Sequence, residues 1–107
     1  MTAYAVAHLR NVELGPEIVE YLRRIDATLA PFSGRFLIHG GEKTVLEGNW
    51  PGDLIVIEFP DRKRAEAWFA SADYQSILVL RTGHADGDVI LVDGVPVGHR
   101  ATDVLPG

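Results

Sequence analysis

Side chains able to bind or activate a small molecule are spread over the whole chain and include two histidines, His8 and His39, and an arginine, Arg10. A second set pairs a cation, Arg35, with a carboxylate, Glu58. Histidine changes charge near neutral pH, a carboxylate can serve as a general base, and arginine stabilises negative charge. These residue types fit anion binding or proton transfer, but they form no pattern that only one reaction requires.

Metal ions and nucleotide cofactors are not expected from the sequence. The chain has no cysteine, so thiolate metal sites and cysteine nucleophiles are excluded. No His-x-x-x-His or Glu-x-x-His spacing occurs, and two histidines without a neighbouring carboxylate make a poor metal site. Glycine-rich phosphate loops and nucleophilic serine motifs are also absent. We therefore predict no cofactor and no metal.

The overall composition describes one acidic domain. A chain of 107 residues with 47% hydrophobic content can fill one core. Ten Lys and Arg against 15 Asp and Glu give a formal charge of -5, which opposes binding to nucleic acid or anionic lipid. The N-terminal segment resembles neither a signal peptide nor a membrane span. We expect a cytoplasmic protein without nucleic-acid or membrane partners.

The elements that must position these residues follow from the hydrophobic periodicity. Strands, helices and strands alternate in the order βαββαβ, which predicts an α+β, ferredoxin-like antiparallel sheet of order 4-1-3-2 with both helices on one face. One helix starts at Gly15-Pro16, and another starts at Asp61 and is recapped at Ser71-Ala-Asp73. A short extra strand is expected at 44–47. Residues 1–94 form the predicted domain, and residues 95–107 form a C-terminal tail.

The two faces of this sheet are predicted to differ. The face under the helices is apolar or small: Ala3, Ala5, Ala7, Leu9, Phe36, Ile38, Gly40, Ile55, Ile57, Phe59, Ile90 and Val92. The other face is mixed: Tyr4, Val6, His8, Arg10, Arg35, Leu37, His39, Leu54, Val56, Glu58, Val89, Leu91 and Asp93. Its centre is too apolar to face water. A second copy would cover it symmetrically, so we predict a homodimer.

The mixed face is expected to hold the candidate pocket. Antiparallel pairing places Arg35 near Glu58, with Tyr4 and Asp93 at the same end of the sheet. This cluster is interpreted either as a structural ion pair or as a general base, Glu58, beside an anion anchor, Arg35. His8, Arg10 and His39 are expected at the other end. The candidate pocket contains Tyr4, His8, Arg10, Arg35, His39, Trp50 and Glu58.

Three aromatic residues and one arginine have both a packing and a functional interpretation. Trp50, followed by Pro51, fits a dimer-interface anchor or the cover of a pocket. Trp68 and Tyr74 fall at helical spacing with apolar neighbours, which favours the core. Arg81 could reach back along the helix stripe, although an arginine in this position is usually solvated.

Several segments together resemble one known family. They are Gly34-Arg-Phe-Leu-Ile-His-Gly-Gly41, Leu46-Glu-Gly-Asn-Trp-Pro51, Val56-Ile-Glu-Phe-Pro60, Ala67-Trp-Phe69 and Ser71-Ala-Asp-Tyr-Gln75. They are similar to the family called domain of unknown function 1330 (DUF1330), over about Tyr4 to Gly94. The resemblance implies a dimeric α/β barrel, in a superfamily that also contains cofactor-free monooxygenases, isomerases, haem-degrading enzymes and proteins of no known activity. Because one scaffold hosts unrelated sites, the resemblance indicates fold more than function.

Two functions remain from the sequence. The first is a small-molecule-binding or structural module with a polar pocket on the sheet face. The alternative is a cofactor-free enzyme that abstracts a proton from, or oxygenates, a small organic substrate. A filled seam between two copies would favour the first, and a closed cavity with a strongly shifted carboxylate or histidine pKa would favour the second.

Overall fold

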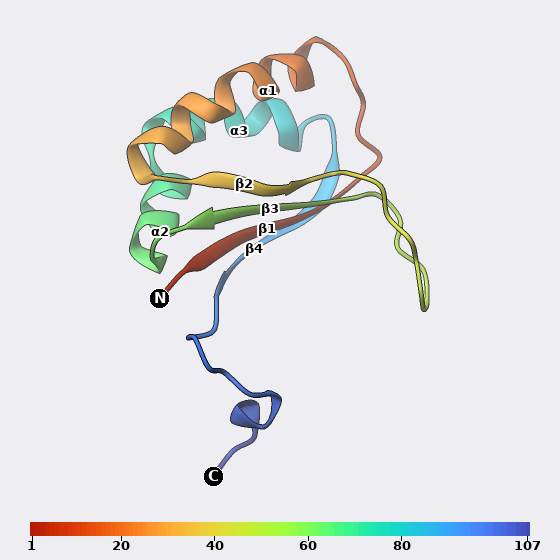
Figure 1. The fold of residues 1–107 in the computed structure, drawn as a ribbon. Coiled ribbons are helices and arrows are strands. Elements are labelled where there is room, and N and C mark those ends of the chain that lie inside the picture. Colours follow the sequence, from red (N-terminus) through yellow and green to blue (C-terminus); the bar gives the residue numbers. More distant parts are fainter.

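A computed structural model describes residues 1–107 and shows one four-stranded sheet with its helices on one face (Figure 1). Neighbouring strands are antiparallel, in the order β2-β3-β1-β4. The predicted ferredoxin-like fold and strand order are confirmed. The elements are β1 (Ala3–Arg10), α1 (Pro16–Leu29), the 3-10 turn η1 (Ala30–Phe32), β2 (Arg35–His39), β3 (Asp53–Phe59), α2 (Arg62–Ala70), α3 (Ala72–Thr82), β4 (Asp86–Asp93) and the 3-10 turn η2 (Ala101–Val104).

The helices begin and end where the sequence provides caps. Pro16 occupies the first position of α1, where its missing N–H costs no hydrogen bond. Asp61 Oδ1 accepts a hydrogen bond of 2.8 Å from the Arg64 amide at the start of α2. Ser71 Oγ accepts from the Tyr74 amide at 3.2 Å, so it caps α3 directly after α2 ends. The predicted break in the second helical segment is confirmed.

The main core lies between the sheet and the helices. Trp68 is buried between Phe59 of β3 and Tyr74 of α3, and its indole Nε1 donates a 3.0 Å hydrogen bond to Thr28 Oγ1 of α1. This packing confirms that Trp68 and Tyr74 belong to the core. The buried cluster consists of Ala3, Ala5, Tyr21, Ile25, Leu29, Ile57, Phe59, Ala65, Trp68, Tyr74 and Ile77.

Strand β2 contains a bulge that changes which side chains face the helices. Phe36 lies opposite Ile57, but the next paired residue, Ile38, lies opposite Val56, so Leu37 is an extra residue in β2. The alternation therefore shifts by one position after Phe36. Ile38 lies on the face without helices and His39 on the helix side, which corrects the predicted face of both residues.

The predicted faces of β4 are also inverted. Ile90 lies opposite Val6, and Leu91 lies opposite Ala5 of the core. Ile90 and Val92 therefore lie on the face without helices, whereas Val89, Leu91 and Asp93 lie on the helix side. The prediction was wrong because Val89 to Val92 is a continuous apolar run. In such a run the sequence does not show which alternate residues face the helices. Asp93, expected beside Tyr4 and Glu58, instead pairs with Arg62 of α2 at 3.4 Å.

We call the face without helices the open face; it consists of Tyr4, Val6, His8, Arg35, Ile38, Leu54, Val56, Glu58, Asp88, Ile90 and Val92. Two segments extend from the sheet toward this side, a hairpin arm at 40–52 and a C-terminal extension at 94–107 (Figure 1). The expected strand at 44–47 does not form, because the arm is irregular and turns at glycines with positive φ at both its ends.

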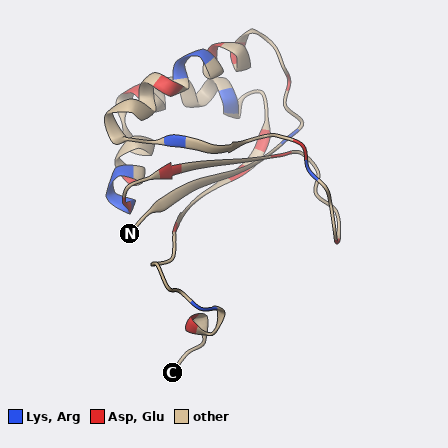
Figure 2. Ribbon diagram, viewed as in Figure 1, with Lys and Arg blue, Asp and Glu red and all other residues tan.

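Charged residues are distributed over the helices, the strand ends and the two extensions (Figure 2). The basic run at the start of α2 is balanced by acidic partners, since Arg64 pairs with Asp61 at 2.7 Å and Arg62 pairs with Glu66 at 2.9 Å. Its charge is therefore largely compensated locally. None of the helices has the length and apolar character needed to cross a bilayer.

Candidate functional site

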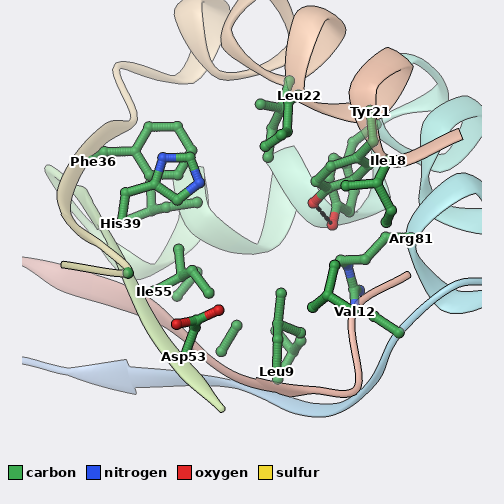
Figure 3. Close-up of a pocket in the computed structure, with 18 of the residues that line it drawn as sticks. Leu9, Val12, Ile18, Tyr21, Leu22, Phe36, His39, Asp53, Ile55 and Arg81 are labelled. Carbon is green, nitrogen blue, oxygen red and sulfur yellow. Dashed lines mark hydrogen bonds between the residues drawn. The ribbon is translucent and has the colours of Figure 1, made fainter. Parts of the chain in front are cut away.

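A cavity of about 270 Å³ lies between the sheet and the helices α1 and α3 (Figure 3). It exists because β1 places small side chains, Ala5 and Ala7, in the middle of the helix side of the sheet. Its walls are mostly apolar and come from every strand: Ala5, Ala7, Leu9, Val12, Leu14, Ile18, Tyr21, Leu22, Ile25, Phe36, His39, Gly40, Asp53, Ile55, Ile57, Trp68, Tyr74, Arg81, Ala85 and Val89.

The exposure of these walls defines an inner end and an opening. Tyr21, Trp68 and Tyr74 are buried and close the inner side. His39 and Leu14 are exposed and border the opening. The cavity can therefore admit a molecule from solvent and hold it against buried side chains.

Two tyrosine hydroxyl groups meet at the inner end. Tyr21 Oη and Tyr74 Oη are joined by a buried hydrogen bond of 2.9 Å. Burial raises the pKa of Tyr21 well above its usual value; the neighbouring Tyr74 raises it further, and the Arg81 guanidinium partly opposes the shift. Tyr21 therefore remains protonated at neutral pH, so one of the paired hydroxyls can donate a hydrogen bond into the cavity.

Arg81 is the cation of this site. It lies in the last turn of α3, is only 7% exposed, and lines the cavity beside Val12 (Figure 3). None of the ion pairs in the structure includes it. The cavity thus combines apolar walls with one buried positive charge.

His39 lies at the opening, on the opposite side of the cavity from Arg81 (Figure 3). Its imidazole stacks on the ring of Phe36, with centroids 4.4 Å apart and planes inclined by 11°. Asp53 also borders the cavity, and its carboxylate pairs with Lys43 Nζ at 3.3 Å. The acidic group at the opening is therefore partly neutralised by its own neighbour.

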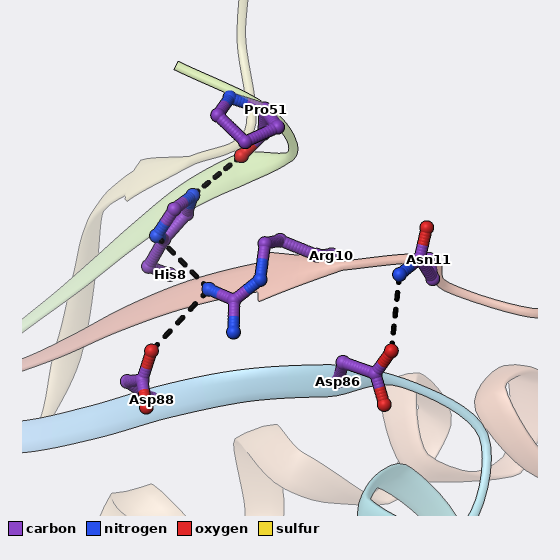
Figure 4. Close-up of polar contacts among 6 residues, drawn as sticks. All are labelled: His8, Arg10, Asn11, Pro51, Asp86 and Asp88. Atoms are coloured by element: carbon purple, nitrogen blue, oxygen red, sulfur yellow. Dashed lines mark hydrogen bonds and ion pairs between the residues drawn. The ribbon is translucent and has the colours of Figure 1, made fainter. Parts of the chain in front are cut away.

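His8 and Arg10 form a separate network on the other side of β1 (Figure 4). The imidazole Nε2 of His8 donates to the carbonyl of Pro51, and Nδ1 accepts from Arg10 Nη1 at 3.2 Å. Arg10 Nη1 also contacts Asp88 Oδ2 at 3.3 Å. Both ring nitrogens of His8 are used, so this histidine fixes the hairpin arm rather than offering a free base.

Trp50 strengthens the same contact. Its ring lies 4.7 Å from the His8 ring, with the planes inclined by 31°. Because Trp50 and Pro51 belong to the hairpin arm, the network attaches the base of this arm to the open face. Trp50 remains 44% exposed, which leaves part of the indole free for further contact.

Arg35 and Glu58 are paired on the open face, as their register predicts. Arg35 Nε donates to Glu58 Oε1 at 3.0 Å, and Tyr4 lies opposite Glu58 on β1. The side chains of Arg35 and Glu58 are 70% and 25% exposed in the single chain. In the single chain the pair is therefore solvated on the arginine side.

The structure divides the seven candidate residues among three places. Tyr4, Arg35 and Glu58 share one end of the open face, and His8, Arg10 and Trp50 form the network at the other end. His39 alone lines the cavity. No three His, Asp or Glu side chains are grouped in a way that could hold a metal ion.

Sequence reasoning did not place Arg81, Tyr21 and Tyr74 together. The signal was present in the helical spacing, because Tyr74, Ile77, Leu78 and Arg81 fall at i, i+3, i+4 and i+7 on one face of α3. A charged residue on an otherwise apolar helix stripe is a candidate for a buried site, since arginine is rarely buried without a partner.

Comparison with known proteins identifies the family. The model of a domain of unknown function, DUF1330, matches residues 2–95. The chain belongs to the DUF1330 family. A comparison with curated proteins finds no significant match.

Solved structures of similar proteins share the fold of this DUF1330 chain. A dimeric ferredoxin-like protein of unknown function from Jannaschia sp. CCS1 has a TM-score of 0.68 at 11% identity and covers 88% of this chain and 100% of its own. A protein of unknown function from Rhodopseudomonas palustris has a TM-score of 0.65 at 15% identity, covering 89% and 83%. SnoaB, a cofactor-independent oxygenase from Streptomyces nogalater, has a TM-score of 0.54 at 10% identity, covering 92% and 96%. At these identities the similarity shows the fold alone.

Proposed function

We propose that this DUF1330 chain is a homodimeric small-molecule-binding protein whose ligand occupies the cavity between the sheet and the helices. The observation that carries the proposal is the cavity of about 270 Å³, closed by buried side chains inside and open near His39. Ligand sites are typically apolar hollows with a few convergent polar groups. The Tyr21–Tyr74 pair, Arg81 and His39 are such groups. The site therefore lies on the helix side of the sheet rather than on the face that the sequence favoured.

Binding is favoured over the enzymatic alternative by the surroundings of His39. His39 is the cavity residue best suited to act as a base near neutral pH. A catalytic base is normally oriented by a hydrogen bond from a third group. The ring of His39 is positioned by stacking on Phe36, while the nearby Asp53 carboxylate pairs with Lys43. This arrangement suits a binding wall better than an acid–base pair.

A second copy on the open face is the other part of the proposal. Ile38, Ile90 and Val92 are exposed there, and no helix covers them. The hairpin arm and the C-terminal extension lie on the same side of the sheet (Figure 1), and they contain further exposed apolar residues: Val45, Leu46, Val95, Val97, Val104 and Leu105. Exposed apolar surface of this kind commonly marks a protein interface. The similar protein from Jannaschia sp. CCS1 is described as dimeric, which agrees with this proposal.

A cavity-filling substitution tests the binding site. Ala7→Leu adds a larger side chain to the cavity wall, whereas Ala27→Leu makes the same change on the exposed surface of α1. Small aromatic and aliphatic acids, amides and alcohols would be screened by ligand-observed NMR against the wild type and both variants. We expect binders of the wild type to be lost in Ala7→Leu and kept in Ala27→Leu. An absence of binders, or binders that Ala7→Leu does not affect, would reject this site.

A further inference from the structure

The buried positive charge of Arg81 indicates the kind of ligand that the cavity accepts. Moving a guanidinium group out of water is costly unless a counter-charge or hydrogen-bond acceptors replace the lost hydration. Arg81 is 7% exposed and has no carboxylate partner in the chain. The nearest acidic cavity residue, Asp53, borders the opening and is paired with Lys43. The cavity therefore contains a positive charge that no carboxylate of the chain neutralises.

We propose that Arg81 is the anchor for a carboxylate and that the ligand is a small monocarboxylic acid with an apolar body. This inference rests on the proposed function of the cavity and specifies its ligand. A guanidinium group can bind a carboxylate through two parallel N–H···O bonds, which gives both affinity and orientation. The carboxylate would lie at Arg81, and the apolar body would extend along the alanine and isoleucine walls toward Phe36 and His39.

The tyrosine pair also favours a carboxylate beside Arg81. Because Tyr21 and Tyr74 share one hydrogen bond, one hydroxyl proton remains available to a further acceptor. Burial is the main cause of the raised pKa of Tyr21, so the Tyr21 hydroxyl is un-ionised at neutral pH. Arg81 offers donors only and the tyrosine pair adds one free hydroxyl proton, so this end of the cavity suits an ionised carboxylate better than an amide.

The size and walls of the cavity restrict the rest of the ligand. Since one water molecule takes up about 30 Å³ of liquid, the cavity would hold on the order of ten non-hydrogen atoms. One buried cation can neutralise one carboxylate but would leave a second anionic charge unpaired among apolar walls. A compact aromatic or branched aliphatic acid therefore fits, while a phosphate ester or a dicarboxylate does not.

Two ligands of similar shape, one charged and one neutral, test the carboxylate inference separately from the proposed binding site. Phenylacetate has the size that the cavity requires, and phenylacetamide has nearly the same shape without the charge. Titration calorimetry of the wild type should show phenylacetate binding about tenfold or more tightly than the amide, because a hydrogen bond to a charged group contributes more than a neutral one. Arg81→Met should remove this preference by weakening phenylacetate while leaving the amide nearly unchanged. Arg81→Lys should give an intermediate preference, since it keeps a charge without the planar fork.

Thermal melting of the ligand-free proteins tests whether Arg81 is merely structural. An unpaired buried charge opposes folding, so ligand-free Arg81→Met should melt at the same temperature as the wild type or higher. A clear loss of stability in Arg81→Met would overturn the inference, because it would show that the chain itself satisfies the guanidinium.

The outcomes remain distinct if a variant fails to fold, because the preference between the two ligands is measured on the wild type. Equal affinity for acid and amide, both lost in Ala7→Leu, would overturn the carboxylate inference and leave the cavity as a binding site. Binding of the acid that Ala7→Leu does not reduce would overturn both.

Discussion

The hydroxyl groups of Tyr21 and Tyr74 join α1 to α3 through a buried hydrogen bond of 2.9 Å at the inner end of the cavity. The rings themselves meet edge to face, with centroids 6.2 Å apart. This buried contact links two helices that are also joined at the surface by a 3.4 Å hydrogen bond from Arg24 Nη2 to Ser76 Oγ. It thus contributes both to folding and to the polarity of the candidate site.

The raised pKa of Tyr21 predicts a stability loss at alkaline pH. In the unfolded chain this tyrosine releases its proton near its ordinary pKa of 10.0, whereas the folded chain retains it to higher pH. Its contribution to stability is therefore complete below pH 10 and declines as the pH rises further. We expect Tyr21→Phe to unfold with a shallower pH dependence above pH 10, measured by urea denaturation. Identical slopes for the two proteins would contradict the predicted shift.

The hydrogen bond between Trp68 and Thr28 predicts a specific cost in the core. Thr28→Val keeps the shape of the side chain but leaves the buried indole N–H without its acceptor, which should cost about 1–3 kcal/mol of unfolding free energy. Thr28→Ser keeps the hydroxyl and loses one methyl group, at a cost of about 1 kcal/mol or less. Urea denaturation followed by tryptophan fluorescence measures both. A larger loss in the serine variant would assign the effect to packing instead.

The open face predicts an assembly that one added charge disrupts. Ile90→Lys places an ammonium group on this face, midway along the edge strand β4, where the exposed fraction of the native side chain is 56%. Val79→Lys makes a similar change on the outer surface of α3, where Val79 is 66% exposed. Sedimentation velocity should show a dimer for the wild type and Val79→Lys and a monomer for Ile90→Lys. A monomeric wild type at micromolar concentration would reject the homodimer.

We expect the interaction free energy between Arg35 and Glu58 to be larger in the dimer than in the monomer. In the monomeric Ile90→Lys background, a double-mutant cycle with Arg35→Ala and Glu58→Ala should give less than about 1 kcal/mol, because the arginine is solvated. In the wild-type background, burial by the second copy should raise the cost of losing either partner to about 3 kcal/mol. A small coupling in both backgrounds would place the pair outside the interface.

The parts of the fold with local signals could be predicted from the sequence. Pro16, Asp61 and Ser71 determine where helices begin, and each does so through its own backbone or side chain. The pairing of Arg35 with Glu58 follows from antiparallel register alone. Such features need only the chemistry of neighbouring residues and the order of the strands.

The candidate site depended on features without a local signal. The bulge at Leu37 moved His39 to the cavity, and nothing in the alternating sequence of β2 marks an inserted residue. The burial of Arg81 depends on how α3 packs against α1 beside the cavity, which is a tertiary property. A periodic pattern predicted both helices but not the empty volume that small residues such as Ala7 leave between them and the sheet.

The bulge at Leu37 also affects how copies of the chain can associate. β2 is an edge strand, and an edge with a regular row of unpaired N–H and C=O groups can recruit another strand and extend the sheet without limit. The extra residue breaks the spacing of that row after Phe36, so a strand added there could not keep a continuous ladder of hydrogen bonds. Growth into open-ended fibrils along this edge is thereby hindered, while the flat side of the sheet remains available for a pairing that closes on itself.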